Sequence, residues 1–191
     1  MTGEPQDSDT DLVHRALAGE ERAYGQLMTR HKDGLYRFAR RYSGNSDDAL
    51  EIVQLTFISA WQALARFDTG RAFDVWLRAI ALNKCRDMAR RRKVRRFMMA
   101  LGQISERQAD PPSLEAGPET QLLDRDELRR ADAAISSLPD GLKAPLLLTA
   151  LDGLTMAEAG AVLGMSAKAV ENRLYRARKA LARTLQLPED S

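Results

Sequence analysis

The side chains best suited to binding chemistry lie on one predicted helix, residues 72–92. Asn83, Asp87 and Arg90 follow Trp76 by 7, 11 and 14 residues, so these four side chains share one face of the helix. Arg78 and Arg86 flank this face. Bases stack on aromatic rings, amides read base edges and guanidinium groups hold phosphates. The face is therefore expected to bind an unstacked DNA strand, although core packing of Trp76 is an equally good explanation of that residue.

Catalytic chemistry has little support. His14 and His31 are isolated, and Cys85 falls on an apolar helical stripe. No spacing typical of metal ligands and no glycine-rich phosphate loop is present. The sequence therefore predicts neither enzymatic activity nor a cofactor.

Charge is distributed in blocks along the 191 residues, although the formal net charge is only +2. Residues 78–96 hold nine Lys or Arg against one acid, and residues 164–187 hold six against one. The stretch between them, residues 105–140, holds nine acids and four Arg. The two basic blocks are candidate phosphate-binding surfaces, and the alternative is a pair of solvated helix faces.

The composition is typical of a protein of the cytoplasm. The single cysteine excludes an intrachain disulfide. No apolar run approaches the roughly 20 residues that a membrane span needs. The first eleven residues are acidic and polar, unlike a signal peptide.

The hydrophobic pattern predicts an all-α fold of two helical domains joined by a flexible linker. The first domain spans 9–96, with helices at 9–18, 20–42, about 46–65 and from 72 into the arginine cluster. The apolar face of the third is expected to carry Val53, Phe57, Trp61 and Leu64, with Ser46 or Asp47 as its cap. Prolines and glycines make 97–120 the linker. The second domain spans 121–187, with helices at 120–136, 141–151, 155–163 and 166–185, the second starting late so that Pro145 lies in its first turn.

Residues 155–185 carry the signature of a helix-turn-helix. Gly164 supplies a left-handed turn, Ser166 caps the second helix, and Gly160 is small where the two helices cross. The second helix of this motif lies in the DNA major groove. The residues expected to reach DNA from it are Ser166, Lys168, Glu171, Asn172, Arg173, Tyr175, Arg176 and Lys179. An ordinary helical hairpin is the plain alternative.

Two further stretches indicate which class of helix-turn-helix protein the sequence resembles. Residues 48–64, DALEIVQLTFISAWQAL, and 73–92, FDVWLRAIALNKCRDMARRR, resemble sigma factor region 2. The second half, with Leu138-Pro139 ahead of its helices, resembles region 4. The order, the short linker and the size are similar to those of the extracytoplasmic-function (ECF) group of bacterial sigma factors.

This resemblance implies a transcription initiation factor whose partners are core RNA polymerase, promoter DNA and an anti-sigma factor, in a stress response. It implies that Asp68, Arg71 and Phe73 border a pocket for a flipped −10 base, with Arg91 and Arg92 extending the DNA-binding face. It further implies that helix 47–65 docks on polymerase through a second face: Asp48, Glu51, Gln54 and Gln62. Leu50, Leu55 and Glu171 depart from the family pattern, which leaves the polymerase contacts and the −35 specificity open.

Two other functions remain to be weighed. A stand-alone helix-turn-helix regulator would leave the 48–92 stretch unexplained. A sigma mimic that titrates an anti-sigma factor could dispense with DNA-reading residues, but Trp76, Asn83 and the basic blocks are present. Both therefore fit the sequence less well than a working sigma factor.

Overall fold

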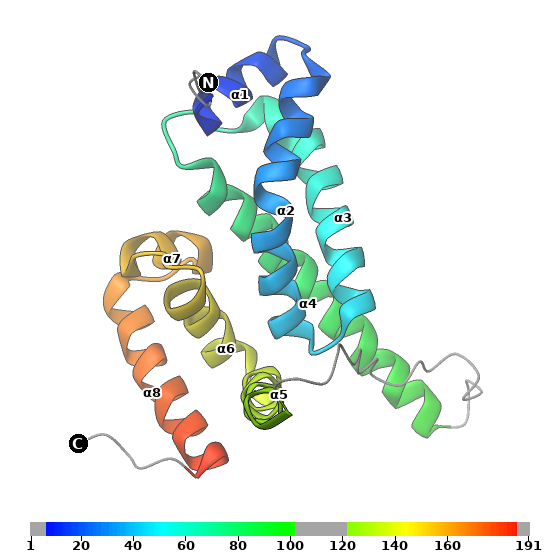
Figure 1. Ribbon diagram of the computed structural model, residues 1–191, viewed down its shortest axis with the longest axis vertical. Helices are drawn as coiled ribbons and strands as arrows, with labels where there is room; N and C mark the ends of the chain where they lie inside the picture. The colour runs from blue at the N-terminus through cyan, green and yellow to red at the C-terminus, as the bar shows by residue number, and fades with distance from the viewer. Residues whose placement is uncertain (1–6, 102–121, 187–191) are drawn as a thin grey trace.

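The computed structural model describes residues 7–101 and 122–186, with side chains throughout except at 122–128. The described residues form helices and no strand, as the sequence predicted (Figure 1). The helices make an N-terminal bundle and a C-terminal helical unit that packs against its side.

The N-terminal bundle contains four helices and one 3-10 turn. In chain order they are α1 (Asp9–Leu17), α2 (Glu21–Ser43), α3 (Ser46–Ala63), η1 (Leu64–Arg66) and α4 (Phe73–Ala100). The three long helices α2, α3 and α4 pack side by side, and α1 lies across one end (Figure 1). Gly44 ends α2 in the left-handed conformation, with φ 72°, because a glycine pays no steric penalty there.

The start and the buried face of α3 differ from the prediction. Asn45 is the cap, since its side chain accepts a hydrogen bond of 2.9 Å from the Asp48 backbone N–H. Neither Ser46 nor Asp47 caps the helix, because both lie inside it. The buried stripe carries mostly small residues that let neighbouring helices approach closely: Ala49, Ile52, Thr56, Phe57 and Ala60. Of the predicted face, Phe57 and Leu64 are buried and Val53 is partly buried, whereas Trp61 is 43% exposed.

Helix α4 is longer than expected and continues to Ala100. The first residues of the predicted linker, 97–100, are therefore helical. Residues 102–121, which contain the rest of the predicted linker, lie outside the described residues.

The C-terminal unit begins with α5 (Leu122–Ser137), continues with α6 (Asp140–Leu146) and η3 (Leu147–Leu151), and ends with α7 (Met156–Leu163) and α8 (Ala167–Leu185). The expected late start before Pro145 was wrong, because α6 already begins at Asp140 and Pro145 lies inside it. Proline cannot donate the hydrogen bond of a helix interior. The chain widens directly afterwards into the π-turn η3, where the Asp152 N–H donates to the Leu147 carbonyl over 3.0 Å.

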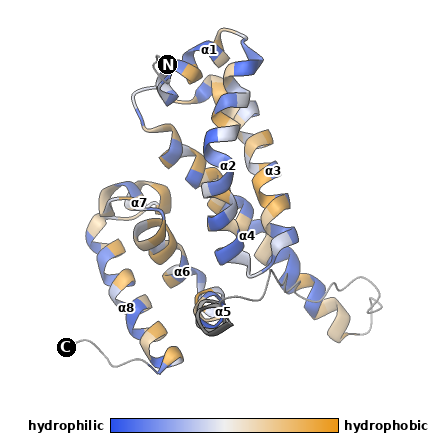
Figure 2. Ribbon diagram, viewed as in Figure 1, coloured by the Kyte–Doolittle hydropathy of each residue, from blue (hydrophilic) through white to orange (hydrophobic). Residues whose placement is uncertain are grey.

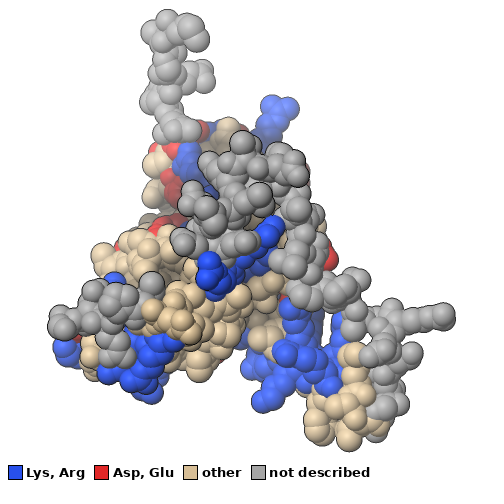
Figure 3. All heavy atoms as spheres, turned by 60° about the horizontal axis from the view of Figure 1, so that its bottom comes forward, with Lys and Arg blue, Asp and Glu red and all other residues tan. Residues whose placement is uncertain are grey.

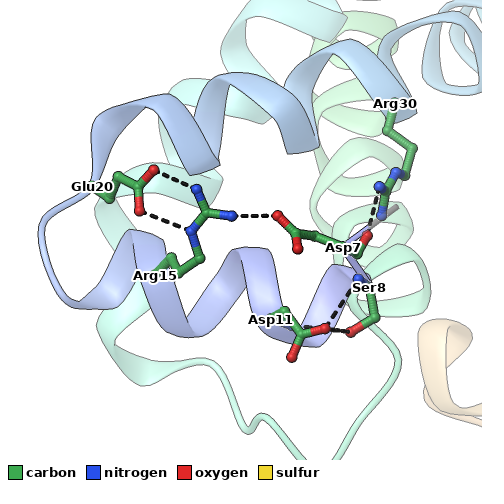
Figure 4. A network of polar contacts seen from close by, with 6 residues as sticks. All are labelled: Asp7, Ser8, Asp11, Arg15, Glu20 and Arg30. Atoms are coloured by element: carbon green, nitrogen blue, oxygen red, sulfur yellow. Dashed lines mark hydrogen bonds and ion pairs between the residues drawn. The ribbon is translucent and has the colours of Figure 1, made fainter. Parts of the chain in front are cut away.

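Polar contacts fasten α1 to α2 (Figure 4). Arg15 forms ion pairs with Asp7 and, at 2.5 Å, with Glu20. Arg30 of α2 donates to the Asp7 carbonyl over 2.8 Å. The first helix is therefore a fixed part of the bundle.

The two units share one continuous apolar core. Leu147 and Leu148 of η3 are fully buried in the same cluster as Phe38 of α2 and Leu77 of α4. Helix α7 contacts α4, and α5 contacts α2. The described structure is thus a closed arrangement in which the C-terminal unit covers part of α2 and α4.

Candidate nucleic-acid interface

The helix-turn-helix is built as the sequence predicted. Thr155 and Glu158 form a reciprocal capping box at the start of α7, and Gly164 ends it with φ 68°. Ser166 caps α8 by accepting from the Ala169 N–H over 3.2 Å. A Cβ on Gly160 would lie 2.6 Å from the Met165 carbonyl oxygen, so only glycine fits at this crossing.

Helix α8 buries one face and exposes the predicted DNA-reading face. Val170, Leu174 and Ala177 are buried against the other helices. The exposed members of the predicted set are Ser166, Lys168, Glu171, Asn172, Tyr175 and Arg176. Tyr175 is 68% exposed, although tyrosine carries a large apolar ring. This face is therefore open to a nucleic acid.

Three predicted residues of α8 lie differently. Lys168 forms an ion pair with Glu171 over 2.8 Å, so the acid that departs from the family pattern neutralises its neighbour. Arg173 is half-buried, with a guanidinium nitrogen 3.7 Å from the Cβ position of Gly141, and so lies toward α6. Lys179 is also only partly exposed.

An aromatic cluster holds the loop before α4. Phe67 and Phe73 stand at its two ends and contact each other edge to face, with ring centroids 5.7 Å apart. Trp76 lies 4.8 Å from Phe67 and is half-buried. Between them, Asp68 and Arg71 are exposed, and the Asp68 carboxylate accepts from the Gly70 N–H over 3.0 Å. Phe73 is only 3% exposed, so in this conformation its ring supports the predicted pocket instead of lining it.

The rest of the predicted α4 face is partly free. Asn83, Arg90 and Arg91 are exposed. Asp87 forms an ion pair with Arg90, one helical turn away. Arg92 pairs with Asp48 of α3 over 2.5 Å, which ties it to the bundle. The structure therefore leaves Asn83, Arg90 and Arg91 as the accessible polar groups of this face.

Arg78 and Arg86 are covered by acids of the C-terminal unit. Arg78 Nε lies 3.0 Å from an Asp152 carboxylate oxygen, and Arg86 Nε lies 3.0 Å from Asp140. Tyr42 of α2 donates a hydrogen bond to the same Asp140 carboxylate. Burial raises the pKa of Asp152 to about 6 and lowers the pKa of Arg78, although each charge favours ionisation of the other. Both arginines therefore lie at the contact between the two units, Arg78 with 14% and Arg86 with 33% of its side chain exposed.

The predicted polymerase-docking residues of α3 are divided between two surfaces. Asp48 and Glu51 face α4, where Glu51 lies 3.8 Å from Arg91. Gln54 and Gln62 instead line a groove of about 870 Å³ between α2 and α3. The apolar side chains along this groove are Tyr24, Met28, Val53, Phe57, Ile58 and Trp61. Figure 2 shows hydrophobic colour along α3, and Ile58 and Trp61 are exposed.

Basic side chains gather at several places on the face that Figure 3 shows, and two of these groups correspond to the basic blocks of the sequence. One covers the far end of α4, with the cluster 90–96, and the other covers α8. Because the patches belong to different units, the two basic blocks of the sequence form two distinct surfaces.

Sequence reasoning missed three features. The apolar lining of the α2–α3 groove was missed because Trp61 was assigned to the core, whereas Trp61 and Ile58 are both exposed there. Nothing in the sequence near Arg78 or Arg86 indicated that they would pair with Asp152 and Asp140. His31 was taken as isolated, but its Nε2 lies 2.7 Å from Asp9.

The parts of the chain that the structure describes offer no group of three or more metal-ligating His, Cys, Asp or Glu side chains. None of the described helices has the length and low polarity that crossing a membrane requires. Cys85 is buried on α4, as expected, and burial raises the pKa of its thiol above the ordinary value.

Two family models match the chain. Sigma-70 region 2 matches residues 27–95, and Sigma-70 region 4 matches residues 128–181. The first covers α3 and most of α2 and α4, and the second covers α6, α7 and most of α8. The predicted resemblance to both regions, in this order, is therefore confirmed.

Curated relatives and solved structures agree with these matches. The RNA polymerase sigma factor CnrH of Cupriavidus metallidurans is 40% identical, over 95% of this chain and 96% of its own length. The ECF RNA polymerase sigma factor SigE of Mycolicibacterium smegmatis is 34% identical, over 93% of this chain and 68% of its own length.

Among solved structures, CnrH in complex with the cytosolic domain of CnrY superposes with a TM-score of 0.71 at 36% identity, covering 94% of this chain and 98% of that one. The sigma factor RpoE of Bartonella quintana, in complex with the anti-sigma factor NepR, shares the fold with a TM-score of 0.67 at 23% identity, covering 87% and 98%. The chain therefore belongs to the ECF group of the sigma-70 family of RNA polymerase sigma factors.

Proposed function

We propose that the two units of this sigma factor divide promoter recognition, with α4 and its preceding loop opening the −10 element and α8 reading the −35 element. The observation that carries the proposal is the pair of separate basic surfaces, each beside groups that can read bases. Phosphate contacts position a protein on DNA, and base-edge contacts specify the sequence. We assign the chain no catalytic step of its own, and we expect it to work in the cytoplasm.

At the −10 element, Asn83 and the exposed Arg90 and Arg91 follow a loop that is held rigidly at both ends. A rigid loop suits the capture of a base that has left the stack, because little further ordering is needed. Asp68 and Arg71 are exposed on that loop and supply polar groups to such a base. Trp76 is half-buried beside that loop, and the buried Phe73 supports the loop from behind.

At the −35 element, α8 enters the major groove with its exposed face. Asn172 can bind adenine through two hydrogen bonds, and Arg176 can bind guanine or a phosphate. Lys168 has to leave Glu171 to contact DNA, since they form an ion pair in the free protein. Glu171 can itself accept a hydrogen bond from cytosine, which gives it a role in specificity.

Polymerase docking is assigned to the α2–α3 groove together with the polar residues on its rim. Exposed large apolar side chains at a groove mark protein interfaces, and here Trp61 and Ile58 lie beside Gln54 and Gln62. Asp48 and Glu51 lie toward α4 and pair with arginines there. We therefore assign docking mainly to the groove, with Glu51 as a charged contact on the separate surface that faces α4.

The closed arrangement restricts the isolated chain. Arg78 and Arg86 are engaged by Asp152 and Asp140, so the C-terminal unit stands where the −10 strand would pass. We expect weak duplex binding by the free protein, and strong promoter binding once polymerase has separated the units. A 20-residue segment joins the two described parts of the chain and permits such a change of distance.

An anti-sigma factor is proposed as the second protein partner, acting in a response to stress. The support is the structural relative CnrH, which was solved with the cytosolic domain of CnrY. An amphipathic helix from the partner would fill the α2–α3 groove, which is apolar along its floor and about 870 Å³ in volume. Polymerase and inhibitor would then compete for Trp61 and its neighbours.

Gel-shift assays with a promoter fragment, run with and without core polymerase, test the proposal. Specific binding is expected only with polymerase, and Trp61→Ala should weaken it through lost docking. Lys32→Ala is a matched control on the polar rim of the same groove and should have a smaller effect. Tight specific binding by the chain alone would favour a stand-alone regulator, and polymerase binding without promoter selection would favour a sigma mimic.

A further inference from the structure

The −10 loop is closed at its base by aromatic rings. Phe67 precedes the loop and Phe73 follows it, and both rings are buried. Their edge-to-face contact, with centroids 5.7 Å apart, brings the two ends of the loop together. Any shift of the Phe73 ring is therefore transmitted to the exposed residues between them.

His31 of α2 lies against this base from the other side. Its ring centroid is 5.5 Å from that of Phe73, at an interplanar angle of 55°. The His31 side chain is only 16% exposed, so it is enclosed between Phe73 and the N-terminal helix. An imidazole has two ring orientations of similar shape, and a polar partner is needed to select one of them.

Asp9, the first residue of α1, supplies that partner. One of its carboxylate oxygens lies 2.7 Å from His31 Nε2, and the other accepts from Arg30 over 2.5 Å. Arg30 also binds the Asp7 carbonyl, which fixes the start of α1 on α2 (Figure 4). A continuous line of contacts therefore runs from Asp9 through His31 to Phe73. Asp9 lies outside residues 27–95, which the region 2 family model matches.

We propose that Asp9 and His31 are positioning residues for −10 recognition, which hold Phe73 and the loop behind it in the conformation that selects bases. The inference rests on the proposed role of that loop. Base selection requires groups held to a fraction of an ångström by the residues packed behind them. Helix α1 would thereby influence promoter choice without touching DNA.

The test uses the full chain with core polymerase and measures one ratio for each variant. The ratio compares the opening rate on a preferred promoter with the rate on promoters that differ by one −10 base. Because both rates come from the same protein sample, a loss of folded protein cancels. A residue that only stabilises the fold would lower thermal stability and leave the ratio unchanged.

His31→Ala and Asp9→Asn are each expected to lower the ratio about two- to tenfold, the range that follows from losing one aromatic contact. Asp9→Asn added to His31→Ala should lower it no further, because both act through the same contact. Asp11→Asn is the matched control: it removes the charge of the α1 capping box, where Asp11 binds Ser8, and leaves His31 in place.

Two results would overturn the inference while leaving the proposed function standing. One is a wild-type ratio in both His31→Ala and Asp9→Asn, with promoter-specific opening by the wild-type protein. The other is an equal fall of the ratio in Asp11→Asn, which would show that the ratio depends on the general stability of α1 and not on the contact between Asp9 and His31. Absence of promoter-specific opening by the wild-type protein would overturn the proposed function and this inference together.

Discussion

Arg78 of α4 and Asp152 after η3 are buried together, with 14% and 8% of their side chains exposed and a nitrogen–oxygen distance of 3.0 Å. The Arg78 Nε and Nη1 atoms and the Asp152 oxygen make no hydrogen bond of good geometry. Burying two charges costs more than an imperfect pair returns. The pair thus lies at the contact between the two units, but its buried charges make closure of the units less favourable.

Two kinds of substitution at this pair should shift the equilibrium between closed and separated units in opposite directions. Arg78→Met combined with Asp152→Leu should tighten closure by about 1–4 kcal/mol, because apolar groups of similar size replace poorly satisfied charges. Asp152→Lys should open it, since the new cation would face Arg37 and Arg41 as well as Arg78. Energy transfer between dyes on α3 and α8 reports the separation. Wild-type separation in both variants would show that the interface is held elsewhere.

Closure should also depend on pH. The pKa of Asp152 is about 6 in the closed form, because burial outweighs the attraction of Arg78, Arg37 and Arg41, while Asp74 adds a like charge. A pKa raised on closure means that the closed form takes up the proton more readily, so closure gains strength as the pH falls from about 6 toward the ordinary carboxyl value of 3.8. Above about 6 the carboxyl group is ionised in both forms and closure no longer depends on it. The same dye pair should report a shorter distance at pH 5 than at pH 7.5. The dependence should shrink in Asp152→Asn, and units that separate on acidification would contradict this account.

The crossing of α7 and α8 should not tolerate a methyl group. Gly160→Ala would place Cβ 2.6 Å from the Met165 backbone oxygen, which cannot move aside as a flexible side chain can. We expect a loss of about 1–3 kcal/mol in the free energy of unfolding of the C-terminal unit. Gly25→Ala in α2 is the control, since nothing lies within 4 Å of its Cβ, and it should gain roughly 0.5–1 kcal/mol. Chemical denaturation followed by circular dichroism measures both, and equal stability of the two variants would be inconsistent with the crossing described.

Asn83→Ala and Trp76→Ala should impair promoter opening more than polymerase binding. Stacking and base contacts contribute about 1–3 kcal/mol per base, so the open complex should become roughly tenfold less stable or worse. Trp76 also contacts Phe67, so its variant needs a check of the fold by circular dichroism. Asn172→Ala on α8 should instead weaken promoter binding without reducing melting in bound complexes. Permanganate footprints equal to wild type in both α4 variants would refute the strand-reading face.

Local signals explain why the helix-turn-helix could be predicted in detail. Its turn and the cap of its second helix depend on single residues and their immediate neighbours, Gly164 and Ser166. The all-α fold could be predicted because the spacing of apolar residues along each helix is also a local signal. The cap at Asn45 was missed because several polar residues in a row can each play that part.

Features that depend on packing between distant segments could not be read from the sequence. Trp61 is 43% exposed although Phe57, one turn earlier on α3, is buried, and only the packing of whole helices separates the two. The meeting of Arg86 with Asp140, and of His31 with Asp9, needs the arrangement of whole helices. The roles of the remaining site residues stay predictions.

The decisive experiment is transcription in vitro with core polymerase over a genomic promoter library. We expect transcripts from one class of promoters that share a −35 and a −10 element. Substitution of Arg176 on α8 should weaken selection of the first element, and substitution of Asn83 on α4 should weaken opening at the second. If core polymerase binds the wild-type chain but starts no promoter-specific transcripts, the chain does not direct promoter recognition.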